Sequence, residues 1–283
     1  MPTLQEVVAQ LTAEFNRKLQ TSLSPFLGSI AVPLLRHDEE HGTWKPHGTG
    51  SLFRIADLHF LVTAAHVLDD FLVSPDKPRS ESPQTLWAAN FAARTQFTIL
   101  GNPLHSREHD LGIVELRTEV VEQFKGMKFL TAADVRPAPV QGVFLVCGFP
   151  EETQTKTTLS VLVYLAPAYE GSTAGLNLDR RTELGLMYDL SFSSGVEPSP
   201  AGLPDRLKGV SGGPVFFIEK PDLQAEIGPD SLRLVGVEHA TQRINAHQQL
   251  IKATRWEGVL VFLARTYLGV DRALGLSGFK LQG

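Results

Sequence analysis

The stretch Gly209-Val-Ser-Gly-Gly-Pro-Val215 places a serine inside a glycine-rich turn and follows it with an apolar run. Gly209 can adopt backbone angles that other residues avoid, so the chain can turn sharply just before Ser211. Pro214 and the β-branched and aromatic residues that follow it disfavour a helix directly after the serine. The stretch therefore predicts a tight turn that leads into a β-strand.

Two other segments carry the side chains that such a serine would need. Leu61-Val-Thr-Ala-Ala-His66-Val67 ends an apolar run at a histidine, and His109-Asp110-Leu-Gly-Ile-Val-Glu-Leu116 begins one at an aspartate. A serine hydroxyl becomes reactive beside a general base, and a carboxylate can hold that base in the required tautomer. The order His66, Asp110, Ser211 is one of the few in which these groups are known to assemble.

Together the three segments resemble the motifs of the trypsin-like (chymotrypsin-fold) serine peptidases, over roughly residues 25 to 265. The resemblance implies an all-β fold of two antiparallel β-barrels with the active site between them. It also implies a serine endopeptidase that hydrolyses a polypeptide substrate through an acyl-enzyme. Ser211 would be the nucleophile, His66 the general base and Asp110 the orienting carboxylate, and neither a cofactor nor a metal ion is expected.

Further residues receive roles from this resemblance. The amide groups of Gly209 and Ser211 would form an oxyanion hole, and Gly212 and Gly213 would leave room for a substrate backbone. Asp205 stands where the family places its specificity residue, and an acid there would favour Lys or Arg in the substrate. The nearby Arg206 and Lys208 could neutralise it. The substrate backbone would pair with the segment formed by Glu238, His239 and Ala240.

The chain divides into four expected parts. They are an N-terminal amphipathic helix (residues 1–24), a first barrel (25–125), a second barrel (126–250), and a C-terminal helix and tail (251–283). Strand-like runs occupy residues 29–36, 51–55, 58–63, 97–100, 111–116, 142–147, 159–165, 186–192, 215–218 and 232–237. Residues 37–47 are expected to be a polar loop.

The two terminal helices carry separate expectations. Thr254 and Glu257 are spaced as the N-cap and third-residue acid of the last helix, at about residues 255–268. The first helix either packs against the barrels or docks a regulatory protein partner.

Composition argues against several other classes of protein. The net charge is −5 and there is no basic run, so nothing points to nucleic acid. No run approaches about 18 apolar residues, as a transmembrane helix requires. The N-terminus does not resemble a secretory signal, and the single cysteine, Cys147, cannot form an intramolecular disulfide. These features predict a cytoplasmic protein whose core depends on packing alone.

Three alternatives remain open. His37, Glu40 and His41 fit an inverted zinc-protease pattern, although that pattern requires a helix. The serine turn also fits the nucleophile elbow of α/β-hydrolases, with Asp230 and His239 as later partners, but those enzymes need a helix after the serine. The main functional alternative is a peptide-binding module of the same fold that is non-catalytic or gated by a partner.

Overall fold

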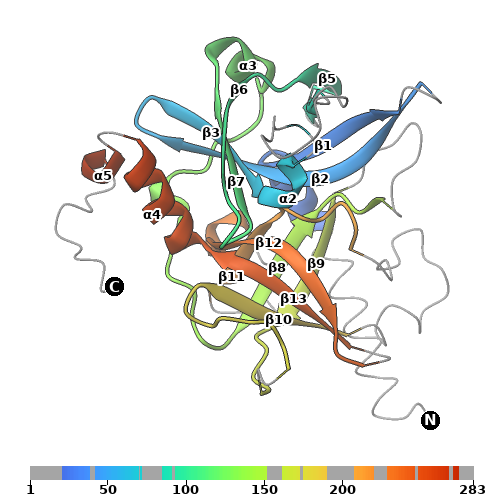
Figure 1. Ribbon diagram of the computed structural model, residues 1–283, viewed down its shortest axis with the longest axis vertical. Helices are drawn as coiled ribbons and strands as arrows, with labels where there is room; N and C mark the ends of the chain where they lie inside the picture. The colour runs from blue at the N-terminus through green and yellow to red at the C-terminus, as the bar shows by residue number, and fades with distance from the viewer. Residues whose placement is uncertain are drawn as a thin grey trace.

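The computed structural model describes residues 21–38, 42–69, 71, 85–90, 93–151, 161–172, 175–189, 207–219, 228–245, 248–267 and 270–273. The protein is mostly β, with one antiparallel sheet above the other in Figure 1. The expected all-β, chymotrypsin-like two-barrel architecture is therefore confirmed. The expected helix in the first 20 residues lies outside the described part of the chain.

The first sheet has seven strands in the order β5-β4-β1-β2-β3-β7-β6. Its central strands follow one another as hairpins, and its two edge strands are joined through residues 99–100. The Ile99 N–H donates to Leu86 O, and the Arg117 N–H donates to Leu100 O, so this connection brings the two edges together. The strands are β1 (Ala31–Asp38), β2 (Thr43–Ile55), β3 (Leu58–Ala64), β4 (Trp87–Asn90), β5 (Thr95–Thr98), β6 (Gly101–Ser106) and β7 (Leu111–Leu116).

The second sheet has six strands in the order β10-β13-β12-β11-β8-β9. A bridge between Ala168 and Leu186 and a 2.8 Å hydrogen bond from the Tyr169 N–H to Gly185 O connect its two edges, so the sheet closes into a barrel. The strands are β8 (Val143–Gly148), β9 (Leu162–Pro167), β10 (Glu183–Asp189), β11 (Pro214–Ile218), β12 (Leu232–Arg243) and β13 (Gln248–Arg255).

The expected polar loop at residues 37–47 is wrong for most of its length. β1 and β2 continue as a long hairpin in which His37 pairs with Trp44. The Trp44 ring lies 4.5 Å from the His37 ring and 4.4 Å from the Trp87 ring of β4. Aromatic pairs across neighbouring strands stabilise a sheet, and this packing extends the strands through a polar sequence. Residues 39–41, which include two of the three zinc-pattern residues, lie outside the description.

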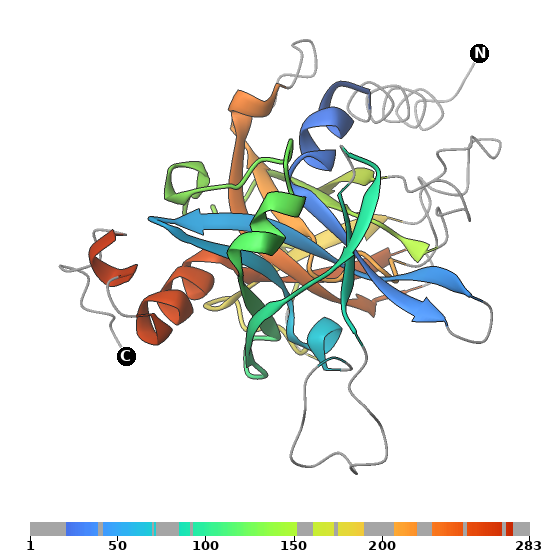
Figure 2. The same cartoon turned by 90° about the horizontal axis from the view of Figure 1, so that it is seen from above.

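Short helices flank and connect the sheets. Residues 21–28 are helical, and Figure 2 shows this helix well separated from α4 (Trp256–Thr266). The other helices are α2 (Ala65–Leu68), α3 (Thr118–Gln123), η1 (Ala132–Asp134), η4 (Pro229–Ser231) and α5 (Val270–Ala273). In the described part of the chain, no helix combines the length and apolar character needed to cross a membrane.

The expected capping of the last helix is wrong. The N-cap of α4 is Arg255, and no side chain caps it. The Thr254 hydroxyl donates to the backbone oxygen of His109 in the first barrel, and the Glu257 carboxylate accepts the Ala138 N–H at 3.2 Å. Both polar side chains therefore tie β13 and α4 to other parts of the fold.

One hydrophobic core joins the helix of residues 21–28, both sheets and α4. Its buried members include Leu27 from the first helix, Phe53 and Phe60 from the first sheet, Cys147 and Phe216 from the second, and Trp256 from α4. Burial also raises the pKa of the Cys147 thiol far above its ordinary value. Cys147 is therefore a core residue, as its place in an apolar run predicts.

Replacing Trp256 with alanine should destabilise the protein strongly. The indole is fully buried and lies 5.2 Å from the Phe53 ring, where α4 meets the first sheet. Truncation of such a side chain leaves a cavity, and we expect a loss of about 3–5 kcal/mol in the free energy of unfolding. Denaturant titration measures it. Val140→Ala, at a residue that is 80% exposed, is the control and should change stability by less than about 0.5 kcal/mol. Equal midpoints for the two variants would contradict this account of the core.

Candidate active site

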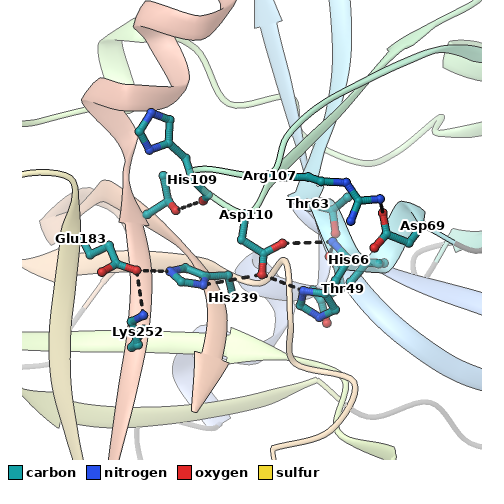
Figure 3. Close-up of polar contacts among 12 residues, drawn as sticks. Thr49, Thr63, His66, Asp69, Arg107, His109, Asp110, Glu183, His239 and Lys252 are labelled. Carbon is teal, nitrogen blue, oxygen red and sulfur yellow. Dashed lines mark hydrogen bonds and ion pairs between the residues drawn. The ribbon is translucent and has the colours of Figure 1, made fainter. Parts of the chain in front are cut away.

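His66 and Asp110 form a close pair at one end of the first sheet (Figure 3). His66 lies in α2, directly after β3, and Asp110 directly precedes β7, the neighbour of β3. His66 Nδ1 lies 2.8 Å from Asp110 Oδ2, and the His66 N–H donates to Oδ1 at 3.0 Å. Asp110 has φ +43°, in the left-handed region, and the Ala65 N–H donates to its carbonyl oxygen at 3.0 Å. Strand pairing and these bonds together hold the strained backbone of Asp110.

The electrostatics of the pair favour a charged carboxylate and a basic imidazole. Burial raises the pKa of Asp110, but the ion pair with His239 and the hydrogen bonds from His66 outweigh it and hold the pKa well below its usual range. The hydrogen bond to Asp110 raises the pKa of His66 above its ordinary value of 6.5, although burial opposes this. Asp110 is therefore ionised at neutral pH and can fix the Nδ1–H tautomer of His66.

Ser211 lies in the turn that precedes β11, and its backbone is attached to both barrels. The Thr49 N–H of β2 donates to Ser211 O at 2.8 Å, and the next amide, that of Gly212, donates to Glu238 O at 2.7 Å. The Glu238 carboxylate lies near the Ser211 hydroxyl and interacts electrostatically with His66. Ser211 and His66 thus share Glu238 as a neighbour, but no hydrogen bond joins the two in the described structure. Catalytic hydrogen bonds often tighten only when substrate is bound.

Two amide groups of the serine turn have no acceptor in the part of the chain that the structure describes. The N–H groups of Val210 and Gly213 bond within the turn, to Leu207 O and Val210 O. Those of Gly209 and Ser211 donate to nothing within the described residues. These are the two donors from which the sequence predicts an oxyanion hole.

Hydrogen bonds to the neighbouring carbonyl groups orient these two amides. Lys208 O accepts the Glu151 N–H at 2.8 Å, and Val210 O accepts the Gly213 N–H at 2.8 Å. In a trans peptide the N–H points opposite to the C=O, so the two bonds also fix where the following N–H groups point. The two N–H groups are thus oriented but make no hydrogen bond within the described residues, as the binding of an anionic oxygen requires. Gly209 itself has φ +91°, as a sharp turn requires.

Thr49 and Thr63, both buried, support the turn from the first barrel, although the sequence motifs did not point to them. The Thr49 hydroxyl donates to Gly209 O at 2.7 Å and accepts the Phe149 N–H at 3.0 Å. The Thr63 hydroxyl donates to Thr49 O at 2.7 Å. A sequence signal existed, because Thr49 stands between two glycines and Thr63 precedes the Ala-Ala-His66 segment.

The expected role of Gly212 and Gly213 is wrong. A Cβ atom on Gly212 would collide with the Thr49 carbonyl and the Thr63 side chain, and one on Gly213 with the Cys147 carbonyl. Both contacts lie inside the protein. These glycines let the serine turn pack closely against β2, β3 and β8, and they do not make space for substrate.

The substrate-binding residues expected in β12 have buried side chains. Glu238 is 1% exposed and His239 7% exposed, so neither side chain is available to a substrate, and Ala240 is half-buried. β11 pairs with β12 only as far as Val237, whereas β13 pairs along the other edge to Arg243. Among described residues the backbone edge beyond Val237 has no strand partner. Strand addition there stays a prediction.

The described residues leave the specificity prediction untested. Asp205 and Arg206 lie outside them. The Lys208 ammonium lies 2.6 Å from the Glu151 carboxylate, so this cation pairs with another acid. The α/β-hydrolase alternative is wrong, because the serine turn leads into β11.

Replacing Glu238 with glutamine should change how stability depends on pH. Burial raises the pKa of Glu238 to about 7, from 4.5, although His239 and His66 oppose this. The folded protein therefore binds the proton more tightly than the unfolded chain. This favourable contribution is complete below about pH 4.5 and is lost as the pH rises towards 7. The free energy of unfolding of Glu238→Gln, measured relative to that of wild type, should therefore rise by on the order of 3 kcal/mol from pH 4 to pH 8.

Denaturant titration of both proteins across this pH range measures the difference. Glu122→Gln, at an exposed carboxylate on α3, is the control. A constant difference between Glu238→Gln and wild type would show that Glu238 does not titrate in this range.

No protein-family model matches the sequence, and no curated protein matches it. Solved structures with similar folds include the following two. One comes from work on the coupled folding and binding of the intrinsically disordered VPg protein of Sesbania mosaic virus, with 16% identity, a TM-score of 0.44, and coverage of 83% of this chain and 89% of that one. The other is the apo MamO protease domain of Magnetospirillum magneticum, with 12% identity, a TM-score of 0.48, and coverage of 84% and 97%. Neither similarity is close enough to carry a conclusion about activity.

Proposed function

We propose that the protein is a serine endopeptidase that cleaves polypeptides through an acyl-enzyme. One observation carries the proposal. The paired His66 and Asp110, 2.8 Å apart, lie beside a serine turn whose two oriented amide groups have no acceptor among the described residues. This set of groups supplies a general base with its orienting carboxylate, and donors for an oxyanion, around one serine.

The proposed first step is the attack of Ser211 Oγ on a peptide carbonyl carbon. His66 Nδ1 faces Asp110, so Nε2 is the nitrogen left to take the Ser211 proton. The carbonyl oxygen becomes anionic and accepts the N–H groups of Gly209 and Ser211, each typically worth about 3 kcal/mol. His66 then gives the proton to the leaving amine, which departs and leaves an ester on Ser211. Water, deprotonated by His66, hydrolyses the ester and restores the serine.

The proposed substrate lies along the edge of β12 beyond Glu238, whose own backbone groups bond to Gly212 and Gly213, as an added strand. Backbone pairing there selects an extended polypeptide and no particular side chain. A preference for Lys or Arg through Asp205 belongs to this proposal as a prediction, as do a cytoplasmic location and a regulatory partner at the N-terminal helix.

One observation favours a second candidate, a binding module whose catalysis is gated. The His66 ring is hydrogen-bonded to Asp110, and no hydrogen bond joins it to the Ser211 hydroxyl in the described structure. A fluorophosphonate probe separates the two candidates, because it labels a serine only when a base activates it. Labelling of the purified chain supports the peptidase, and labelling only in the presence of a partner supports gating.

Ser211→Ala should abolish fluorophosphonate labelling and lower the rate of peptide cleavage by at least about 10⁴-fold, because the bond-forming oxygen is removed. Circular dichroism and the unfolding midpoint should stay close to those of wild type. Ser231→Ala, in η4 and away from the serine turn, is the matched control and should keep both activities. Equal cleavage by Ser211→Ala and wild type would overturn the proposed function.

The activity should fall as the pH is lowered through the pKa of His66. Its base form must be neutral, and the Asp110 hydrogen bond raises the pKa of His66 above 6.5, so the acid limb of kcat/KM should lie above pH 6.5.

Asp110→Asn should lower kcat by roughly 10⁴-fold, because an amide can donate to Nδ1 and favour the wrong tautomer. Rates measured from pH 5 to pH 9 check both statements. An acid limb below pH 6 would exclude His66 as the base.

A further inference from the structure

We propose that His239 is a positioning residue of this site: as a buried imidazolium held by Glu183, it fixes the Asp110 carboxylate and limits how tightly His66 holds a proton. The inference rests on the proposed function and extends it to a residue outside the expected triad. It concerns the side chain of His239 and leaves the predicted backbone pairing of this segment with substrate as it is.

The first support is a row of alternating charges that ends at the candidate triad. Figure 3 shows a spatial row across the site in the order Lys252, Glu183, His239, Asp110 and His66. The Lys252 ammonium lies 3.0 Å from Glu183 Oε1, the same oxygen lies 3.1 Å from His239 Nε2, and His239 Nδ1 lies 3.7 Å from Asp110 Oδ2. The contact of Nε2 with Glu183 is an ion pair that lacks good hydrogen-bond alignment.

The second support is the protonation state that this geometry requires. A neutral imidazole has one donor and one acceptor nitrogen, so it would direct a lone pair at one of two carboxylates. An imidazolium carries a proton on both nitrogens and suits both neighbours. Burial lowers the pKa of His239, but Asp110 and Glu183 outweigh it and raise the pKa to about 9. The other charged groups facing the ring are Glu238 of β12 and His66 of α2.

The third support is the effect of this charge on the two neighbours. Asp110 is hydrogen-bonded to His66 and forms a longer ion pair with His239, and the contact with His239 is one cause of its depressed pKa. The positive charge of His239 also lowers the pKa of His66, against the rise that Asp110 causes. Replacing His239 with an uncharged side chain that keeps a hydrogen-bond donor should therefore raise the pKa of His66. At neutral pH more of the base would then be protonated and inactive.

The elements that bring these residues together belong to the second barrel. Glu183 lies at the start of β10, Lys252 in β13 and His239 in β12, and the sheet order places these strands side by side. A bulge between Glu238 and Ala240 interrupts the pairing of β12 with β13 at His239. Buried ion pairs are weak evidence for stability, since apolar residues often serve as well. The position of this row, directly behind Asp110, is what assigns it to the site.

The test is an NMR titration of the histidine side chains in the inactive Ser211→Ala protein, combined with the pH profile of kcat/KM in the active one. In the Ser211→Ala background, His239 should remain protonated at pH 7. Adding His239→Gln, which keeps an amide donor and removes the charge, should raise the pKa of His66 by about 0.5–1. In the active protein the same change should move the acid limb up by the same amount. The variant should therefore have a lower kcat/KM than wild type at pH 7, and this difference should disappear near pH 9.

His105→Gln, at an exposed histidine of β6, is the matched control and should leave the acid limb in place. If His239→Gln fails to fold, Glu183→Gln tests the same point, because it should lower the pKa of His239 while the imidazole stays in place. A neutral His239 at pH 7, or an unchanged pKa of His66 in a folded His239→Gln protein, would overturn the inference. The titration needs no catalysis, so a chain that cleaves no peptide would refute the proposed function and leave this result interpretable.

Discussion

The candidate site depends on the hydrogen bond from the Thr49 hydroxyl to Gly209 O, which fixes the first barrel against the serine turn of the second. The same hydroxyl accepts the Phe149 N–H, and the Thr49 N–H donates to Ser211 O. In the opposite direction, the Thr254 hydroxyl of the second barrel donates to His109 O, beside Asp110. Each barrel therefore positions a segment of the candidate site that belongs to the other.

The second constraint is that several ionisable side chains lie close together with little exposure to solvent. Asp110 lies between His66 and His239, so its charge is balanced by an imidazole on either side. Glu238 lies among the same groups but burial keeps its pKa near 7, and its Oε2 has no hydrogen-bond partner in the described structure. Buried charges are costly unless paired, so these two carboxylates differ in ionisation at one pH although both are close to His66.

The fold and the three motif residues could be predicted because each motif adjoins an apolar strand with a strong local pattern. β3, β7 and β11 all have the expected positions within about one or two residues. The errors arise where a distant partner decides the outcome. Thr254 was expected to cap α4, but His109 O is its acceptor. The polar residues 37–38 and 43–47 belong to β1 and β2 because Trp44 packs on Trp87. The row behind Asp110 needs strand register, which places Glu183 beside Thr254 and Ala240 beside Lys252.

The reciprocal bonds between the barrels also determine what happens if the chain is cut. The connection between the barrels runs past Val140, an exposed position where a protease could nick the backbone. The two fragments would remain associated, since Phe53 and Trp256 pack in one shared core and Thr49 and Thr254 bind across the boundary. Cys147 is buried and unpaired, so no disulfide among the described residues adds to this association. Separation of such fragments would dismantle the site even where each sheet kept its strands.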